Sequence, residues 1–231
     1  MHIPDGYLGP QTYIPLYAAS FAFWGVAAKK LKKTLKARQV PLLAMAAAFS
    51  FVIMMFNVPL PGGTTGHAVG ATLAAIVIGP WAAIISVSIA LIIQAILFGD
   101  GGITAIGANC FNMGIIMPFV GYWTYRAIAF GSETSSVRRW VGAGIAGYVS
   151  LSVAALAAAI QFGIQPMIAH TPDGQPLYAP YSLSVAIPAM VGGHMMLFSF
   201  IEGIVTALVV AYIAKSDESL LFNYRPALKR N

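Results

Sequence analysis

Charged residues are scarce in this 231-residue sequence, at 9% of positions, whereas 58% are hydrophobic and the mean hydropathy is +0.78. A soluble protein normally has about a quarter of its residues charged, so this composition excludes a water-soluble globular protein. At about 20 apolar residues per membrane span, the length accommodates roughly six to eight spans and leaves no separate aqueous domain. We therefore expect a single all-α integral membrane domain over residues 1–231.

Cysteine is represented by Cys110 alone, which excludes a disulfide within one chain and a cluster of thiolate metal ligands. Enzyme motifs are also missing. The sequence contains neither H-E-x-x-H nor G-x-S-x-G, so it shows no metalloprotease or serine hydrolase machinery. It lacks the P-loop pattern G-x-x-x-x-G-K-[ST] as well, so any dependence on ATP has to come from another chain. The remaining polar chemistry rests on four histidines and a few carboxylates.

The opening sequence MHIPDGYLGP has no basic segment, apolar run and cleavage site of the signal-peptide kind, so we expect it to stay on the chain. Apolar runs separated by proline, glycine and charged residues predict seven membrane spans after it. The last span is expected to be broken near its start by Pro188 and by Gly192–Gly193. The seven predicted spans are 12–28, 41–57, 67–78, 81–98, 103–129, 140–162 and 182–214.

Basic residues test this arrangement, because they collect on the cytoplasmic side of membrane proteins. All 13 Lys and Arg residues lie at the end of the first, fifth or seventh span or after it, which places them on one side. We therefore expect a multi-pass protein of the cell membrane, with its N-terminus outside and its C-terminus in the cytoplasm. The charges of the outer side are the carboxylates of Asp5, Asp100 and Asp173, which attract cations.

His2 brings three nitrogen donors together: the α-amine of Met1, its own backbone nitrogen and its ring. Binding through all three would close two adjacent chelate rings around one metal. A strongly polarising ion such as Cu(II) or Ni(II) is needed to displace the amide proton, and imidazole suits both metals. A histidine from elsewhere would complete a square-planar site of four nitrogens. The alternative is that His2 is the second residue of a frayed terminus.

Two other histidines flank expected external loops. His67 follows the proline- and glycine-rich break at residues 58–66, and irregular backbone at membrane depth marks binding sites. The alternative is that His67 starts a helix and is hydrogen-bonded to a carbonyl group. We expect His170, in the loop 165–181, to be a solvated residue or part of a path by which a ligand arrives.

Several polar residues fall within the predicted spans. His194 and Glu202 lie about two turns apart on one face of the last span, where ionisable groups are costly and tend to be functional. For both of them, and for Asn57 at the end of the second span, we expect a structural role or hydrogen bonds that support a site. Asn109 and Asn112 are expected to pack and to form hydrogen bonds.

Small residues mark two surfaces suited to close helix contacts. Ala44 and Ala48 lie one turn apart in the second span, and the sequence GAGIAG occupies residues 142–147 in the sixth. Each surface is expected either to pack inside the protein or to contact a partner membrane protein.

Four segments together closely resemble the CbiM/NikM family, the substrate-binding components of energy-coupling factor transporters for cobalt and nickel. These segments are MHIPDGYL at residues 1–8, PGGTTGH at 61–67, FGDGGITA at 98–105 with GAN at 107–109, and the stretch from His194 to Glu202. The resemblance implies a six-helix core at 41–214, an extra N-terminal helix at 11–28 and a cytoplasmic tail at 215–231. It also implies that segment 1–10 is inserted into the protein, with the metal held by the Met1 amine, the His2 amide and ring nitrogens, and His67.

The resemblance further implies capture of external Ni(II) or Co(II) as a transported substrate, without a catalytic cofactor or covalent chemistry. The implied partners are a transmembrane coupling subunit, two cytoplasmic ATPase subunits and, in many cases, a small accessory membrane protein. The Ala44–Ala48 surface resembles the alanine-rich face that contacts the coupling subunit. Pro4-Asp5 after Met-His-Ile is more similar to nickel members than to cobalt members. Larger fused members carry an additional domain after this core, whereas this sequence ends at Asn231.

Two other functions compete with this hypothesis. A stand-alone divalent metal channel or exchanger would need a polar path through several spans, and the sequence offers only His194 and Glu202. An intramembrane enzyme that uses these two residues would need a paired nucleophile or a metal motif, which the sequence does not show.

Overall fold

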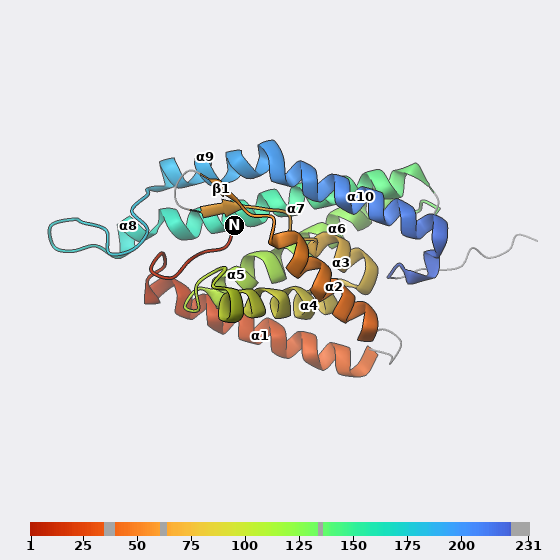
Figure 1. Ribbon diagram of the computed structural model, residues 1–231, viewed down its shortest axis with the longest axis horizontal. Coiled ribbons are helices and arrows are strands. Elements are labelled where there is room, and N and C mark those ends of the chain that lie inside the picture. Colours follow the sequence, from red (N-terminus) through yellow and green to blue (C-terminus); the bar gives the residue numbers. More distant parts are fainter. Residues whose placement is uncertain (35–39, 61–63, 134–135, 223–231) are drawn as a thin grey trace, which may run out of the picture.

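The computed structural model of the protein describes residues 1–34, 40–60, 64–133 and 136–222 and is a helix bundle (Figure 1). Wider π-helical turns, labelled η2 to η4, occur at three places: η2 ends the helix that α4 begins, η3 joins α5 to α6, and η4 joins α9 to α10. In chain order, the elements are α1 (Pro10–Thr34), α2 (Val40–Met54), β1 (Val58–Leu60), β2 (Thr64–Gly66), α3 (Ala71–Ile78), α4 (Pro80–Ile93), η2 (Gln94–Phe98), α5 (Ile106–Asn109), η3 (Cys110–Ile116), α6 (Met117–Ala129), α7 (Val137–Gly163), α8 (Gln165–Ile168), α9 (Leu183–Gly193), η4 (His194–Phe198), α10 (Ser199–Ser216) and the short 3-10 helix η5 (Glu218–Leu220).

The predicted all-α membrane class is confirmed. Three continuous helical stretches are long and apolar enough to cross a membrane, and α2 is apolar but shorter. The number of seven spans stays a prediction. The three long stretches are Pro80–Phe98, Val137–Ile168 and Leu183–Ser216.

The predicted third span, residues 67–78, is wrong in its extent. Helix α3 has only eight residues and begins at Ala71, which gives it a length of about 12 Å, against roughly 30 Å for the hydrocarbon core of a membrane. Residues 67–70 are not helical. Helix α3 therefore cannot cross a membrane by itself.

The predicted break at Pro188 and Gly192–Gly193 is also wrong. The helix runs on from α9 through η4 into α10 without interruption. Pro188 lies inside α9, and a proline is tolerated in a membrane helix where local π adjustments and neighbouring helices satisfy the freed backbone groups. The irregularity lies just after the two glycines, where the π-helical turn starts at His194.

The predicted break at residues 58–66 is a β hairpin. Strands β1 and β2 pair antiparallel, with Val58 opposite Gly66 and Leu60 opposite Thr64, while residues 61–63 lie outside the described part. A Cβ atom on Gly66 would lie 2.0 Å from the ring of Phe198. Glycine at this position therefore lets the hairpin lie directly against η4.

The basic residues of the described chain lie at the ends of four helices, at one end of the bundle. Figure 1 shows the ends of α1 and α10 and the start of α7 at this end, opposite the loop between α8 and α9. These residues are Lys29, Lys30, Lys32, Lys33, Arg126, Arg138, Arg139 and Lys215, whereas Lys36, Arg38, Arg225, Lys229 and Arg230 lie outside the described residues.

Helix α7 is the centre of the packing, in contact with α6, α9 and α10. Its glycines permit the closest approach, because a Cβ atom on Gly147 would lie 3.1 Å from the carbonyl oxygen of Glu202 on α10. The small-residue surface at 142–147 therefore packs inside the protein. Ala44 and Ala48 on α2 are exposed, so that surface is available to a partner.

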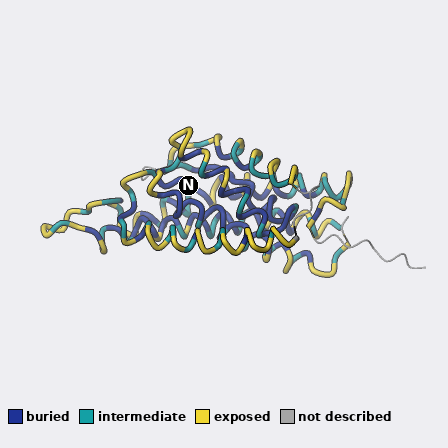
Figure 2. The backbone as a smooth tube through the Cα atoms, turned by 90° about the horizontal axis from the view of Figure 1, so that it is seen from below, coloured by how far each residue is buried: buried dark blue, intermediate teal, exposed yellow. Residues whose placement is uncertain are grey.

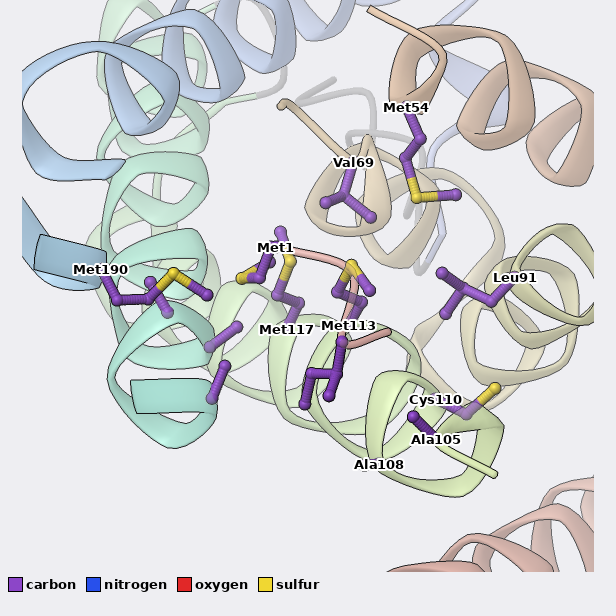
Figure 3. Packing of buried hydrophobic residues seen from close by; sticks show 14 of the residues in the cluster. Met1, Met54, Val69, Leu91, Ala105, Ala108, Cys110, Met113, Met117 and Met190 are labelled. Carbon is purple, nitrogen blue, oxygen red and sulfur yellow. The ribbon is translucent and has the colours of Figure 1, made fainter. Parts of the chain in front are cut away.

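The N-terminal segment, residues 1–9, enters the bundle with its first three residues, whereas Asp5 and Gly6 are exposed. Met1 and Ile3 are fully buried and belong to the main hydrophobic core, as does Cys110. Figure 2 shows this buried interior along the bundle, and Figure 3 shows the Met1 side chain among those of Met113, Met117 and Met190. The chain thus brings its own N-terminus to a position enclosed by helices.

Close packing between α7 and α10 predicts opposite effects for two alanine substitutions. In Gly203→Ala, the new Cβ atom would lie 2.7 Å from the backbone oxygen of Gly144, and such overpacking destabilises a protein by about 1–3 kcal/mol. In Gly192→Ala, nothing lies within 4 Å of the new atom, and the better helix former stabilises by up to about 1 kcal/mol. Thermal unfolding in detergent should show a lower Tm for the first variant only. An equal Tm in both variants would contradict the packing.

Candidate metal centre

Three hydrogen bonds, two of them with the Asn109 side chain, hold the N-terminal segment in place at Ile3. The backbone nitrogen of Ile3 donates to Oδ1 of Asn109 at 2.8 Å, and Nδ2 of Asn109 donates to the Ile3 carbonyl at 3.2 Å. The backbone nitrogen of Gly102 donates to the same carbonyl at 2.8 Å. A buried backbone needs such partners because an unpaired polar group costs free energy. The hydrogen-bonding role expected for Asn109 is thereby confirmed.

A second attachment is made by Asp5, at the outer end of the segment. Its carboxylate accepts hydrogen bonds from the backbone nitrogens of Ile103 (3.1 Å) and Thr104 (2.8 Å) and from the Thr104 hydroxyl. The bond from the Thr104 hydroxyl is the main reason why the pKa of Asp5 lies below its usual value. The Asp5 carboxylate is therefore occupied by the loop before α5.

The α-amine of Met1 meets strand β2. It donates to the carbonyl oxygen of Thr65 and lies 3.2 Å from the Thr65 hydroxyl. Burial lowers the pKa of this amine to about 4. At neutral pH the amine is therefore uncharged and carries a lone pair that a metal can accept.

The ring of His2 is buried and its tautomer is fixed by Gln94. Its Nε2 lies 3.2 Å from Oε1 of Gln94, whose own Nε2 donates to the carbonyl of Phe51 at 3.2 Å. Because Gln94 presents its oxygen, the proton of the ring lies on Nε2 of His2. The other nitrogen, Nδ1, keeps its lone pair and has no hydrogen-bond partner. Burial lowers the pKa of His2 to about 3, so the ring is neutral.

The structure brings His67 against His2. The two rings stack with their centroids 4.6 Å apart and an angle of 28° between their planes. Nδ1 of His67 lies 3.0 Å from the Ala68 carbonyl and carries the proton, while the buried Nε2 has no hydrogen-bond partner. Each histidine therefore offers one ring nitrogen with a free lone pair. Their roles as metal ligands stay predictions.

Glu202 fixes the turn that carries His67. Its carboxylate, buried on α10, accepts hydrogen bonds from the backbone nitrogens of Val69 (2.7 Å) and Gly70 (2.9 and 3.1 Å). The start of α3 has no cap from its own side chains, and the carboxylate supplies the acceptor that the free backbone N–H groups need. Glu202 thus acts on the position of His67 through the backbone.

The remaining residues that the sequence analysis singled out, Asn57, His194 and His170, do not stack against His2 as His67 does. Asn57 donates from Nδ2 to Oδ2 of Asp100 at 2.8 Å. His194 is fully buried, with Nδ1 2.7 Å from the Met190 carbonyl and no partner for Nε2. His170 is exposed in its loop. Among the described residues, no three side chains of His, Cys, Asp or Glu are grouped to hold a metal.

The loop at residues 99–102 shapes the outer wall of the site. Gly99 and Gly101 have φ angles of 66° and 88°, which L side chains rarely adopt. A Cβ atom on Gly101 would lie 2.9 Å from Nδ2 of Asn109 and 3.3 Å from Cδ2 of His2. Asp100 is turned toward His2 as a result, with Oδ1 3.3 Å from Nδ1 of the ring.

Sequence reasoning did not identify Gln94, Thr65 or the contact of Asp100 with His2. Gln94 carries no motif, and a glutamine at the end of an apolar run is usually a boundary residue. The sequence does indicate the turn that carries Asp100, because a carboxylate between glycines predicts a tight turn with one charged group. Its contact with His2 depends on the insertion of the N-terminal segment.

The whole chain is similar to known metal transport proteins. Residues 2–220 match the family described as the cobalt uptake substrate-specific transmembrane region, CbiM. The fused nickel transport protein NikMN of Rhodobacter capsulatus is 52% identical over 96% of this chain, which spans 64% of that protein's length. The probable fused nickel transport protein LarMN of Lactiplantibacillus plantarum is 46% identical over 100% of this chain and 69% of its own length. A crystal structure of a transition metal transporter has 53% identity and a TM-score of 0.90, with 94% of each chain covered.

Close contact between Gly102 and Asp5 predicts that Gly102→Ala expels the N-terminal segment. The new Cβ atom would lie 2.3 Å from the backbone nitrogen of Asp5, so either the loop at residues 99–102 or the N-terminal segment has to move. The Met1 amine should then react with an N-hydroxysuccinimide ester, as measured by mass spectrometry of the N-terminal peptide. The control is Gly99→Ala, where the Cβ position is open and only the positive φ is strained, at about 1–2 kcal/mol. Equal protection of the amine in both variants would argue against the inserted segment.

Proposed function

The chain belongs to the family of cobalt uptake substrate-specific transmembrane regions, and on that premise we propose that it is the metal-binding subunit of an energy-coupling factor transporter. It captures Ni(II) or Co(II) from outside the cell and passes the ion inward when partner ATPases hydrolyse ATP. The observation that supports this most directly is the pair of buried, neutral histidines, each with an unpartnered ring nitrogen, next to a buried, neutral α-amine. The protein itself catalyses no covalent chemistry.

The proposed ligands are four nitrogens. The Met1 amine, the His2 backbone nitrogen and Nδ1 of His2 close two chelate rings, and Nε2 of His67 takes the remaining corner. The tautomers support this set, because Gln94 and the Ala68 carbonyl hold the protons on the other ring nitrogens. A histidine ligand whose second nitrogen is fixed by a hydrogen bond is the usual arrangement in metal sites.

Four nitrogens in a plane favour Ni(II), which accepts square-planar geometry, over ions that prefer oxygen ligands. The relatives in Rhodobacter and Lactiplantibacillus are named as nickel transport proteins, which supports nickel as the main substrate. Co(II) accepts the same donors and remains the second substrate of the proposal.

We propose the partners that the family resemblance implies, and two features of the described chain support them. The exposed Ala44–Ala48 surface of α2 suits close contact with a transmembrane coupling subunit. The basic end of the bundle, formed by the ends of α1 and α10 and the start of α7, faces the cytoplasm, where two ATPase subunits bind. The N-terminal segment then opens to the outside, from which the ion arrives. A small accessory membrane protein completes the proposed complex.

The first test concerns the free N-terminus. Adding Gly-Ser before Met1 converts the amine into an amide, so Ni(II) affinity in calorimetry should fall by about 100-fold or more, which corresponds to about 2.8 kcal/mol. The same dipeptide added at the C-terminus is the control and should leave the affinity unchanged. Retained affinity in the N-terminal variant would exclude the amine as a ligand. Metal uptake into liposomes by the isolated chain would instead support a stand-alone channel or exchanger.

The second test concerns His67. In His67→Ala one corner of the site is left to water, so Ni(II) affinity should fall by at least the roughly 10- to 100-fold that loss of a supporting hydrogen bond costs a metal site. The visible absorption band of square-planar Ni(II) should weaken or shift as well. His170→Ala, in the exposed loop, is the matched control and should bind as the unmodified protein does. The same affinity in both variants would remove His67 from the ligand set.

A further inference from the structure

Asp100 stands between the aqueous surface and the proposed site. Its side chain is 19% exposed, whereas that of His2 behind it is 3% exposed. One carboxylate oxygen, Oδ2, accepts the hydrogen bond from Asn57, and the Asp100 backbone nitrogen donates to the Gln94 carbonyl at 3.1 Å. Oδ1 is then aimed at Nδ1 of His2, 3.3 Å away.

The contact between Oδ1 and Nδ1 joins two acceptors. The proton of the His2 ring lies on Nε2, toward Gln94, so Nδ1 has only a lone pair to offer. If the ring proton moved to Nδ1, the lone pair on Nε2 of His2 would face Oε1 of Gln94 and repel it. The Gln94 amide could not turn to donate instead, because its NH2 group already donates to the Phe51 carbonyl. An ionised carboxylate oxygen and a lone pair this close repel each other unless a cation or a proton lies between them, and burial raises the pKa of Asp100 from its usual value.

The neighbouring carboxylates of Asp5 and Glu202 already accept hydrogen bonds from backbone N–H groups. Asp5 accepts from the backbone of Ile103 and Thr104, and Glu202 accepts from the backbone of Val69 and Gly70. In the described part of the chain, Oδ1 of Asp100 is therefore the carboxylate oxygen that contacts His2 and accepts no hydrogen bond from another group. It lies on the side from which water and ions have access.

We propose that Oδ1 of Asp100 is the first protein ligand of the incoming Ni(II) or Co(II) ion and passes it to Nδ1 of His2. This inference rests on the proposed function. A hydrated dication is attracted by a carboxylate at the rim, which raises the rate of encounter. The borderline-soft imidazole nitrogen, one contact further in, then replaces the oxygen. After transfer the carboxylate stays beside the ion and offsets part of its charge.

The test is Asp100→Asn in the full chain, because asparagine keeps an oxygen acceptor for Asn57 and removes the charge. Stopped-flow mixing with NiCl2 should show an association rate constant that is lower by about tenfold or more, with a weaker dependence on ionic strength. The absorption band of the loaded site should be unchanged, because the four nitrogens are still present. Asp173→Asn, which removes a carboxylate of the loop between α8 and α9, is the matched control and should associate at the unmodified rate.

Three outcomes separate the possibilities. An unchanged association rate in Asp100→Asn overturns the inference and leaves the proposed function intact. A lower rate with an altered absorption band, or with a Met1 amine that reacts with the succinimide reagent, assigns Asp100 a purely structural role and also overturns it. Failure of the unmodified chain to bind Ni(II) saturably overturns the proposed function, and the inference with it.

Discussion

Burial of the N-terminus within a membrane bundle is the constraint on which the rest of the structure depends. Each polar group of the first residues leaves water and needs a partner from the protein. Thr65 supplies it for the Met1 amine, Gln94 for the His2 ring and Asn109 for the Ile3 backbone. Three separate parts of the chain thus have to converge on one extended segment, and their positions are fixed together.

The irregular elements of the bundle lie where this convergence occurs. The π-helical turn η2 begins with Gln94, η3 follows directly after Asn109, and η4 ends with Phe198, whose ring lies against Gly66 of the hairpin. A π-helical turn holds one extra residue and so redirects the side chains that follow, which is why such turns occur at functional sites. The β hairpin and the short α3 add two more departures from regular helix beside the same segment. Regular helices would not present these groups inward at the required depth.

The sequence predicted the membrane class, helices close to those at residues 80–98 and 137–163, and the position of the described basic residues at one end of the bundle, because hydropathy and charge are local properties. It could not predict the non-helical backbone at residues 67–70, since that depends on Glu202, a partner 132 residues away from Gly70. The hydrogen bonds of Asn109 to Ile3 and of Gln94 to His2 likewise join residues 106 and 92 positions apart. The ligand set of Met1, His2 and His67 came from the chemistry of an N-terminal histidine and from family resemblance. Packing alone reveals the contact of Asp100 with His2.

The same burial also prepares the proposed site for metal. In water an α-amine is mostly protonated at neutral pH, so a metal has to displace its proton before it binds. In the inserted segment the pKa of the Met1 amine is about 4, so the proton is already gone, and both rings hold their protons on the nitrogens that face away from the metal. Loading then has one remaining proton to remove, that of the His2 amide. Since only strongly polarising ions readily displace an amide proton, the step that remains is also the step that discriminates between metals.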